Sequence, residues 1–309
     1  EQLGVTIMPE QEVQDIRLLE DGGYQLTIRK STGLKRPYRK LQAIKVILSG
    51  GVLGTVKLLL KCKHKGSLNN ISPKLGDFVR TNSEAIIGIK LKKTPSEDFS
   101  KGVAISAGFY PDEKTHIETV RYGKGQSAMA LLTTFLPDRK IPLPSLIRWG
   151  ISVIRSPFQF VSNFFPFGWA KKTIILLVMQ PVDNYLKLNY KSRWWRLGGF
   201  SMNSQSSDGK SIPSHIPLAE ETAEGIIAKT GGTTMTTYMD AFFNIPTTAH
   251  ILGGACIGKD LASGVIDENF EIFNYPGMYV IDGSMIPSNL GVNPSLTITA
   301  MAEYAMSRF

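Results

Sequence analysis

Two short segments near the end of the chain carry residues suited to chemistry. The apolar, strand-like run Met278–Ile281 is followed by Asp282-Gly283-Ser284. A carboxylate at the end of a strand, followed by glycine, is a common way of holding a ribose or ribityl hydroxyl. Asn293-Pro294-Ser295 then opens a predicted helix over 296–307, with Asn293 as N-cap and Pro294 as its first residue. The N–H groups at this start either face an electron-rich ring carbonyl or belong to a well-capped helix without a ligand.

A second glycine-containing turn lies early in the chain. Residues 41–48 (LQAIKVIL) predict an apolar strand, and residues 55–63 have the composition of a helix. Between them stand Gly50 and Gly51, which allow the start of a helix to approach a phosphate or an adenine edge closely. A plain tight turn between strand and helix explains the same residues equally well.

Three longer segments carry the C-terminal motifs of a known family. They are AHILGG at 249–254, DGS at 282–284 and GVNPSLTITA at 291–300, with weaker matches at 49–54, 72–76 and 115–118. Together they span nearly the whole chain. The sequence resembles the glucose–methanol–choline (GMC) oxidoreductases and, within that family, the cholesterol oxidase-like branch.

This resemblance implies FAD-dependent oxidation of a 3β-hydroxysteroid to the ketone, by hydride transfer to flavin N5 with oxygen as acceptor. His250 matches the active-site histidine, which orients the hydroxyl and helps to move its proton, and Asn293 matches its amide partner. Glu118 is the candidate for the glutamate that carries a proton where the family also isomerises a double bond. Isomerase activity is left open, because this equivalence rests on position alone.

The resemblance also implies where FAD lies. Asp282 and Gly283 are expected near the ribityl–phosphate part, whereas Val13, Gly50 and Gly51 are expected on the adenine side. The backbone N–H groups that follow Asn293 and Pro294, from Ser295 onward, would stabilise charge on the flavin. Asn82 is a further candidate close to the flavin.

One part of the family pattern does not occur in this sequence. The family opens with a strand, G-x-G-x-x-G and a helix, which hold the pyrophosphate. The only similar run is GKGQSA at 123–128, before a helix-like stretch, and it has no acidic residue about twenty positions further on. We therefore expect an N-terminally incomplete chain, or one half of a split protein, completed by a segment carrying G-x-G-x-x-G.

Residues 136–172 combine aromatic and basic side chains, including Trp149 and Phe164, with Asp138 as their only acid. Such a stretch favours a helix and loop lying in a membrane interface, and a buried insertion or a partner surface is the alternative. A membrane surface could also attract the eleven lysines and arginines between Arg29 and Lys65, where no acid occurs. That run matches no nucleic-acid motif.

Composition sets the frame for these motifs. The chain has 309 residues, of which 42% are hydrophobic and 20% charged, with a net charge of +9, as expected of a folded protein with one or two domains. Two distant cysteines and four scattered histidines predict neither a disulfide scaffold nor a metal site. No signal peptide is visible, which favours a peripheral membrane or cytoplasmic location.

The predicted fold class is α/β. Residues 1–92 and 245–309 are expected to form a discontinuous, partial Rossmann-like FAD-binding domain, the second segment carrying the active-site residues. Residues 93–244 are expected to form a sheet-containing α+β substrate domain, with 173–182 as a central strand. The alternative functions are a GMC alcohol dehydrogenase or oxidase with a non-sterol substrate, and a non-catalytic lipid-binding remnant at the membrane surface.

Overall fold

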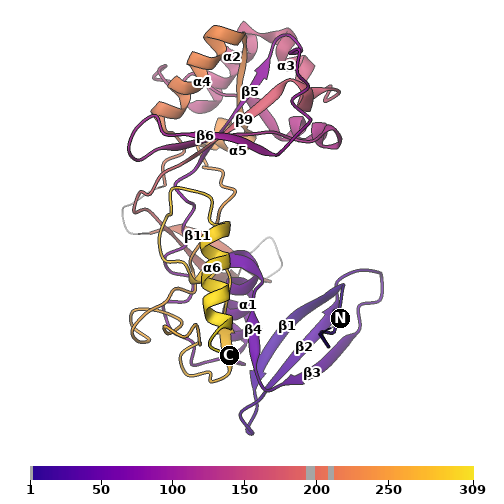
Figure 1. The fold of residues 1–309 in the computed structure, drawn as a ribbon, viewed down its shortest axis with the longest axis vertical. Coiled ribbons are helices and arrows are strands. Elements are labelled where there is room, and N and C mark those ends of the chain that lie inside the picture. Colours follow the sequence, from indigo (N-terminus) through magenta and orange to yellow (C-terminus); the bar gives the residue numbers. More distant parts are fainter. Residues whose placement is uncertain (1–2, 193–198, 208–211) are drawn as a thin grey trace.

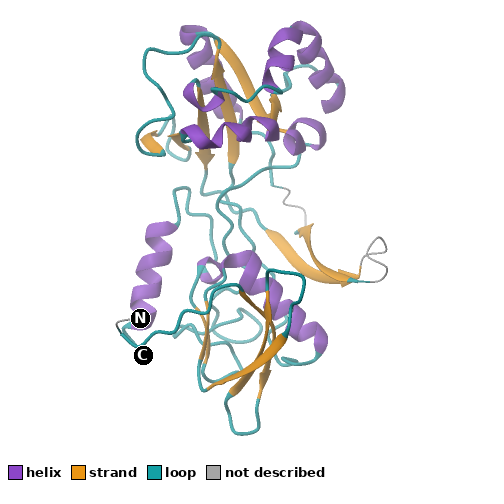
Figure 2. Ribbon diagram, turned by 90° about the vertical axis from the view of Figure 1, so that its right-hand side faces the viewer, coloured by secondary structure: helices purple, strands orange, loops and turns teal. Residues whose placement is uncertain are grey.

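The computed structural model describes residues 3–192, 199–207 and 212–309. Figure 1 shows an elongated molecule with an upper and a lower part, joined by several extended segments that form a neck. The upper part contains a six-stranded sheet and its helices, and the lower part contains the remaining strands, α1 and α6 (Figure 2). This mixed α/β architecture confirms the predicted fold class.

The lower part begins with an antiparallel three-stranded sheet in the order β1-β2-β3. In the turn between the first two strands, the N–H of Gly23 donates to the Asp21 carboxylate at 3.1 Å. Residues 4–9 form no strand. The strands are β1 (Gln11–Leu18), β2 (Tyr24–Lys30) and β3 (Tyr38–Ala43).

A parallel pair of strands, β4 and β13, lies beside this sheet. The expected single strand over 41–48 is wrong, because residues up to Ala43 pair with β2 whereas residues from Val46 pair with β13. Helix α1 follows β4 and begins four residues earlier than expected. The elements are β4 (Val46–Leu48), α1 (Gly51–Lys65), β13 (Met278–Val280) and the C-terminal α6 (Ser295–Met306).

The upper sheet has the strand order β6-β7-β9-β5-β12-β8, and every pairing in it is antiparallel. The predicted central strand is confirmed as β9, which lies between β7 and β5 and is almost wholly buried. The strands are β5 (Ala85–Leu91), β6 (Ile105–Phe109), β7 (His116–Val120), β8 (Thr133–Phe135), β9 (Thr173–Met179) and β12 (Gly232–Thr237).

Helices cover both faces of this sheet. Buried alanines of α4 pack on one face, and Trp169 with Ala130 packs on the other. The helix-like run after residue 127 belongs to a nine-residue 3₁₀ helix, and β8 follows it. The helices are η1 (Lys124–Leu132), α2 (Ser145–Arg155), α3 (Pro157–Asn163), η2 (Trp169–Lys171), α4 (Pro217–Thr230) and α5 (Tyr238–Phe243).

A hairpin of β10 (Leu186–Ser192) and β11 (Phe200–Ser206) joins the lower core through Leu188. The chain crosses the neck repeatedly. Strand β5 falls within residues 1–92, which are predicted to belong to the FAD-binding domain, but it forms part of the upper sheet. The predicted domain limits stay a prediction.

Gly253 marks a very close backbone approach in the lower part. It has a φ of +76°, and a Cβ built on it would lie 2.0 Å from the carbonyl oxygen of Phe78. We expect Gly253→Ala to lower the free energy of unfolding by about 2–4 kcal/mol, because both the left-handed backbone and the contact disfavour a side chain. Urea unfolding measures the change.

The matched control is Gly150→Ala, in the exposed helix α2, where a Cβ would meet nothing within 4 Å. This substitution should raise stability by roughly 0.5–1 kcal/mol through helix propensity. Equal stabilities for the two variants would contradict the packing at Gly253.

Candidate active site

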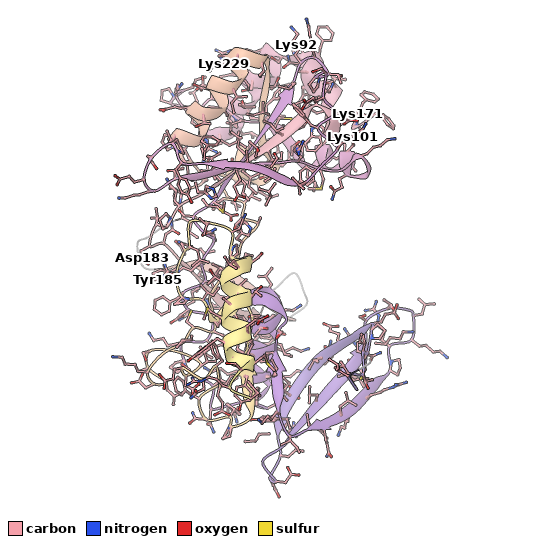
Figure 3. The ribbon with its side chains drawn as sticks, in the orientation of Figure 1. Lys92, Lys101, Lys171, Asp183, Tyr185 and Lys229 are labelled. Carbon is pink, nitrogen blue, oxygen red and sulfur yellow. The ribbon has the colours of Figure 1, made fainter. Side chains whose placement is uncertain are left out.

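Arg80 fixes the segment that leads into the site. Its Nε donates to the carbonyl of Pro287 at 2.9 Å, and its Nη1 donates to the Asp183 carboxylate at 2.6 Å. The guanidinium also lies over the ring of Tyr185, 4.9 Å from its centroid. Figure 3 shows Asp183 and Tyr185 close to the neck. The chain leaving Arg80 therefore has a defined position as it crosses from the lower to the upper part.

Glu84, at the end of this segment, holds His250. The Glu84 side chain is completely buried, and its Oε1 contacts Nδ1 of His250. Its other oxygen accepts the Thr248 hydroxyl at 2.8 Å and the N–H of Ala249 at 2.5 Å. A carboxylate that accepts from Nδ1 fixes both the orientation and the tautomer of an imidazole, leaving Nε2 free to interact with another group.

Asn293 is held in a different way, by Glu118. Its Nδ2 donates to both carboxylate oxygens of Glu118, at 2.8 and 2.9 Å. Glu118 is buried in β7, and Nδ1 of His116 lies 3.8 Å from its carboxylate. The Oδ1 atom of Asn293 is also buried and has no hydrogen-bond partner among the described residues. The Oδ1 atom of Asn293 is therefore available to accept a hydrogen bond from a ligand or from another group outside the described residues.

Asn82 connects these two pairs. It is fully buried, accepts the N–H of Gly291 at 2.9 Å and donates to the carbonyl of Val292 at 2.9 Å. Asn82 therefore holds the loop that presents Asn293, while Glu84, two residues later, holds His250. Residues 82–84 thus hold His250 and the loop before Asn293, and Glu118 holds Asn293 itself. The roles of these four predicted site residues stay predictions.

The residues expected near FAD fall into two groups. Val13 and Gly50 line one cavity of about 390 Å³ between β1, β4 and α1, and Gly51 follows with a left-handed φ of +67°. Asp282 and Gly283 lie buried at the end of β13. The Asp282 carboxylate accepts the hydroxyls of Thr55 and Ser284, each at 2.5 Å, so it already holds α1 against this turn.

The start of α6 differs by one residue from the prediction. Pro294, not Asn293, occupies the N-cap position, because the Asn293 amide is used by Glu118. Ser295 is the first residue of the helix, and no side chain of the described residues caps it. Figure 1 shows this end of α6 pointing at the neck. Its free N–H groups are thus available to an electronegative group there.

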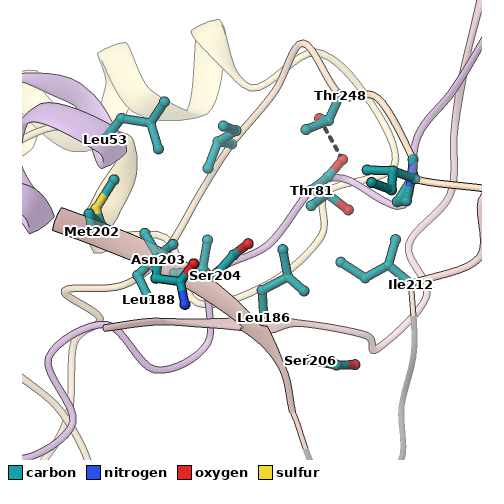
Figure 4. Close-up of a pocket in the computed structure, with 14 residues that line it drawn as sticks. Leu53, Thr81, Leu186, Leu188, Met202, Asn203, Ser204, Ser206, Ile212 and Thr248 are labelled. Carbon is teal, nitrogen blue, oxygen red and sulfur yellow. Dashed lines mark hydrogen bonds between the residues drawn. The ribbon is translucent and has the colours of Figure 1, made fainter. Parts of the chain in front are cut away.

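An apolar cavity of about 510 Å³ lies beside the His250 loop. Thr248 and Ile251, on either side of His250 in the chain, both line it, and Thr248 donates to the carbonyl of Thr81 at 2.8 Å (Figure 4). The opposite wall comes from α1 and the β10–β11 hairpin. The cavity is suited to a hydrophobic group placed near His250.

Sequence reasoning did not find Glu84. No motif marks it, and its partner His250 is 166 positions away in the chain.

Other reactive groups are less suited to chemistry, since burial raises the pKa of the Cys256 thiol to about 11 and keeps it protonated. Among the described residues, no cluster of His, Cys, Asp or Glu could hold a metal ion.

Comparison with solved structures shows the fold. Pyridoxine 4-oxidase from Mesorbium loti superposes with a TM-score of 0.50 at 13% identity, covering 97% of this chain and 57% of that chain. This likeness concerns the architecture alone.

Sequence comparison finds relatives in one family. Residues 212–302 match the C-terminal domain of the GMC oxidoreductases. Cholesterol oxidase of Acinetobacter baumannii is 40% identical, over 99% of this chain and 56% of that protein. Cholesterol oxidase of Mycobacterium tuberculosis H37Rv is 39% identical, over 99% and 54%. The chain is thus similar to GMC oxidoreductases over nearly its whole length, and it spans about half the length of these curated relatives.

The role of Glu84 in positioning His250 can be tested by substitution. Glu84→Gln replaces a buried acceptor with an amide that cannot accept all three donors, so we expect a loss of about 1–3 kcal/mol in stability. The Nδ1 proton of His250 should also exchange faster with water. Chemical denaturation and nitrogen-15 NMR of the histidine rings measure the two effects.

Glu271→Gln is the matched control, because Glu271 also accepts a backbone N–H, that of Gly277, at 2.6 Å. It should lose stability but leave the His250 signal unchanged. An unchanged Nδ1 proton in Glu84→Gln would show that Glu84 does not position His250.

Proposed function

We propose that this chain forms part of an FAD-dependent enzyme that oxidises a hydrophobic secondary alcohol, a 3β-hydroxysteroid, to the ketone, with oxygen as acceptor. The observation that carries the proposal is the anchoring of the His250 and Asn293 loops on residues 82–84. The relatives named cholesterol oxidase support the substrate class. The resemblance noted from the sequence points to the same reaction.

The residues present fit a flavin. The buried, unpartnered Oδ1 of Asn293 and the uncapped start of α6 offer polar atoms to a ring system at the neck. The cavity lined by Val13 and Gly50 offers space on the adenine side. A bound FAD would supply the acceptor for the hydride that leaves the alcohol carbon. Pro294 itself contributes no N–H, so Ser295 and the residues after it supply the donors.

His250 is the proposed acceptor of the hydroxyl proton, which the oxidation also releases. Because Glu84 accepts from Nδ1, Nε2 is the nitrogen that faces the substrate and can accept its hydroxyl proton. Glu84 then stabilises the positive charge that forms on the ring. The apolar cavity next to Thr248 and Ile251 would take the hydrocarbon part of the alcohol.

A flavin dinucleotide's pyrophosphate is commonly held by a glycine-rich turn between a strand and a helix. Among the described residues β4 pairs with β13 alone, and Ile47 and Leu48 of β4 line the same cavity as Val13 and Gly50. We propose that a strand followed by G-x-G-x-x-G pairs there in parallel, which would place the glycine loop beside Asp282.

The flavin proposal is tested on the whole protein. We expect a yellow protein whose flavin absorbance bleaches when cholesterol is added without oxygen, and which forms hydrogen peroxide when air is admitted.

Glu118→Gln should still form the ketone but should lose any shift of the double bond. Substrate-dependent bleaching that reduces a dye without peroxide would indicate a dehydrogenase. A colourless protein that binds liposomes would overturn the proposal in favour of a lipid-binding remnant.

We also propose that the upper part docks on a membrane through α2 and α3. The outer sides of these helices and the following loop carry exposed apolar residues, including Ile154, Phe158 and Phe167, at 80%, 90% and 89% exposure. Aromatic side chains flanked by exposed Arg155 suit the headgroup layer. Among the described residues, no helix combines the length and apolar character needed to cross a bilayer.

Trp149, expected on this surface, does not lie on it. Its indole N–H donates to Thr134 at 2.8 Å, and its ring packs edge-on against Phe160 and Phe242. Trp149 therefore joins α2 to β8 and α5. Its substitution would damage the fold and would not test membrane binding.

The membrane proposal predicts that Phe158→Ser combined with Phe167→Ser weakens binding to liposomes at least about ten-fold, because each phenyl ring contributes about 1.5–3 kcal/mol when buried. Liposome flotation measures the bound fraction. Leu34→Ser removes an equally exposed apolar side chain between β2 and β3 and should have no effect. Unchanged flotation of the double variant would exclude this surface.

A further inference from the structure

A small cavity in the upper part is lined by three lysines. Its volume is about 80 Å³, above the about 10–15 Å³ that a single water requires. It lies between α3 and the ends of β5 and β12, and Figure 3 shows Lys92 at this end of the molecule. Lys90 is six residues beyond Glu84 on an extended strand, about 20 Å from the candidate active site. We call this cavity the lysine pocket, and its main polar residues are Lys90, Lys92, Lys172, Gln159, Ser162, Asn163 and Thr233.

Lys90 is the most constrained of these lysines. Its Nζ donates to the Ser162 hydroxyl at 3.0 Å and to Oδ1 of Asn163 at 2.6 Å, which leaves one of three N–H groups unused. Burial, with the positive charge of Lys172, lowers the pKa of Lys90 to about 8. No ion pair joins Lys90, Lys92 or Lys172 to any described carboxylate. The pocket thus concentrates positive charge that the described residues do not neutralise.

A second observation indicates a ligand. Asn163 is 6% exposed, and its Nδ2 is buried without a hydrogen-bond partner among the described residues. Its Oδ1 is used by Lys90, so the free end of the amide is a donor. Buried donors are almost always satisfied in folded proteins. The pocket therefore has an excess of donors and lacks an acceptor with negative charge.

We propose that the lysine pocket binds a phosphate group. A phosphate carries between one and two negative charges near neutral pH and has several oxygens, which together can accept from ammonium groups and from an amide. The occupant is either a free phosphate or the head group of an anionic phospholipid. Helix α3 and the two residues after it expose Phe158, Phe164 and Phe165, which would lie near acyl chains if the source is a lipid.

The test is calorimetric titration of the whole protein with inorganic phosphate, against chloride at equal ionic strength. We expect saturable binding at one site. Lys90→Met keeps the apolar stem of the side chain and removes its charge, and it should weaken binding at least about ten-fold, because one charge-assisted hydrogen bond is lost. Should this variant fold poorly, the exposed Lys92→Met provides a second measurement and should weaken binding about three-fold.

The matched control is Lys259→Met, which removes one positive charge from an exposed loop outside the pocket. Phosphate affinity should change less than two-fold in this variant. Absence of saturable binding to the unaltered protein would overturn the proposal. An equal loss in Lys259→Met and Lys90→Met would also overturn it, because the attraction would then come from net charge.

Vesicles distinguish the two sources of phosphate. If a lipid head group occupies the pocket, Lys90→Met should bind phosphatidic acid vesicles more weakly than the unaltered protein, and inorganic phosphate should compete. If the source is a free phosphate, vesicle binding should be equal for both proteins while calorimetric binding is lost. The proposed membrane surface is measured independently, because its double phenylalanine variant retains all three lysines.

Discussion

Residues 80–84 form a buried polar segment on which the geometry of the candidate site depends. Glu84 and Asn82 are buried, and each uses its side chain to hold a loop that is distant in sequence. Asn82 and Ser83 also adopt positive φ angles, which non-glycine residues rarely do without compensating contacts. Both polar atoms of the Asn82 and Glu84 side chains are bonded, so another arrangement of either side chain would leave a buried donor or acceptor unsatisfied. The site is therefore fixed by bonds and not only by packing.

The neck explains why the chain is organised in discontinuous segments. His250 comes from the loop that pairs with Arg80 through Leu252, whereas Glu118 comes from β7 in the upper sheet. A reaction at this point needs groups from both parts in fixed positions. The chain achieves this by crossing the neck several times, so that each part orients the side chains of the other.

Local signals in the sequence were sufficient for some of these features and not for others. The turn at Asp282 and the start of α6 could be predicted within one residue, because strand ends and helix caps are determined by neighbouring residues. Glu84 could not be predicted, since its partner is 166 positions away and no spacing rule links them. Trp149 was assigned to the surface because composition does not distinguish an aromatic side chain that faces a membrane from one that packs under a helix.

The parallel pair β4–β13 forms a sheet of only two strands among the described residues. Parallel strands are normally buried on both faces and flanked by further strands, because their hydrogen bonds are otherwise open to water. Among the described residues β4 has one neighbour, and its Ile47 side chain is partly exposed beside the cavity lined by Val13 and Gly50. A strand added at this edge would bury Ile47. It would also bring a glycine loop to the end of β4, next to the start of α1, which no side chain caps. The same contact would thus complete the sheet and the dinucleotide site, so we expect folding of this edge and binding of the cofactor to be coupled.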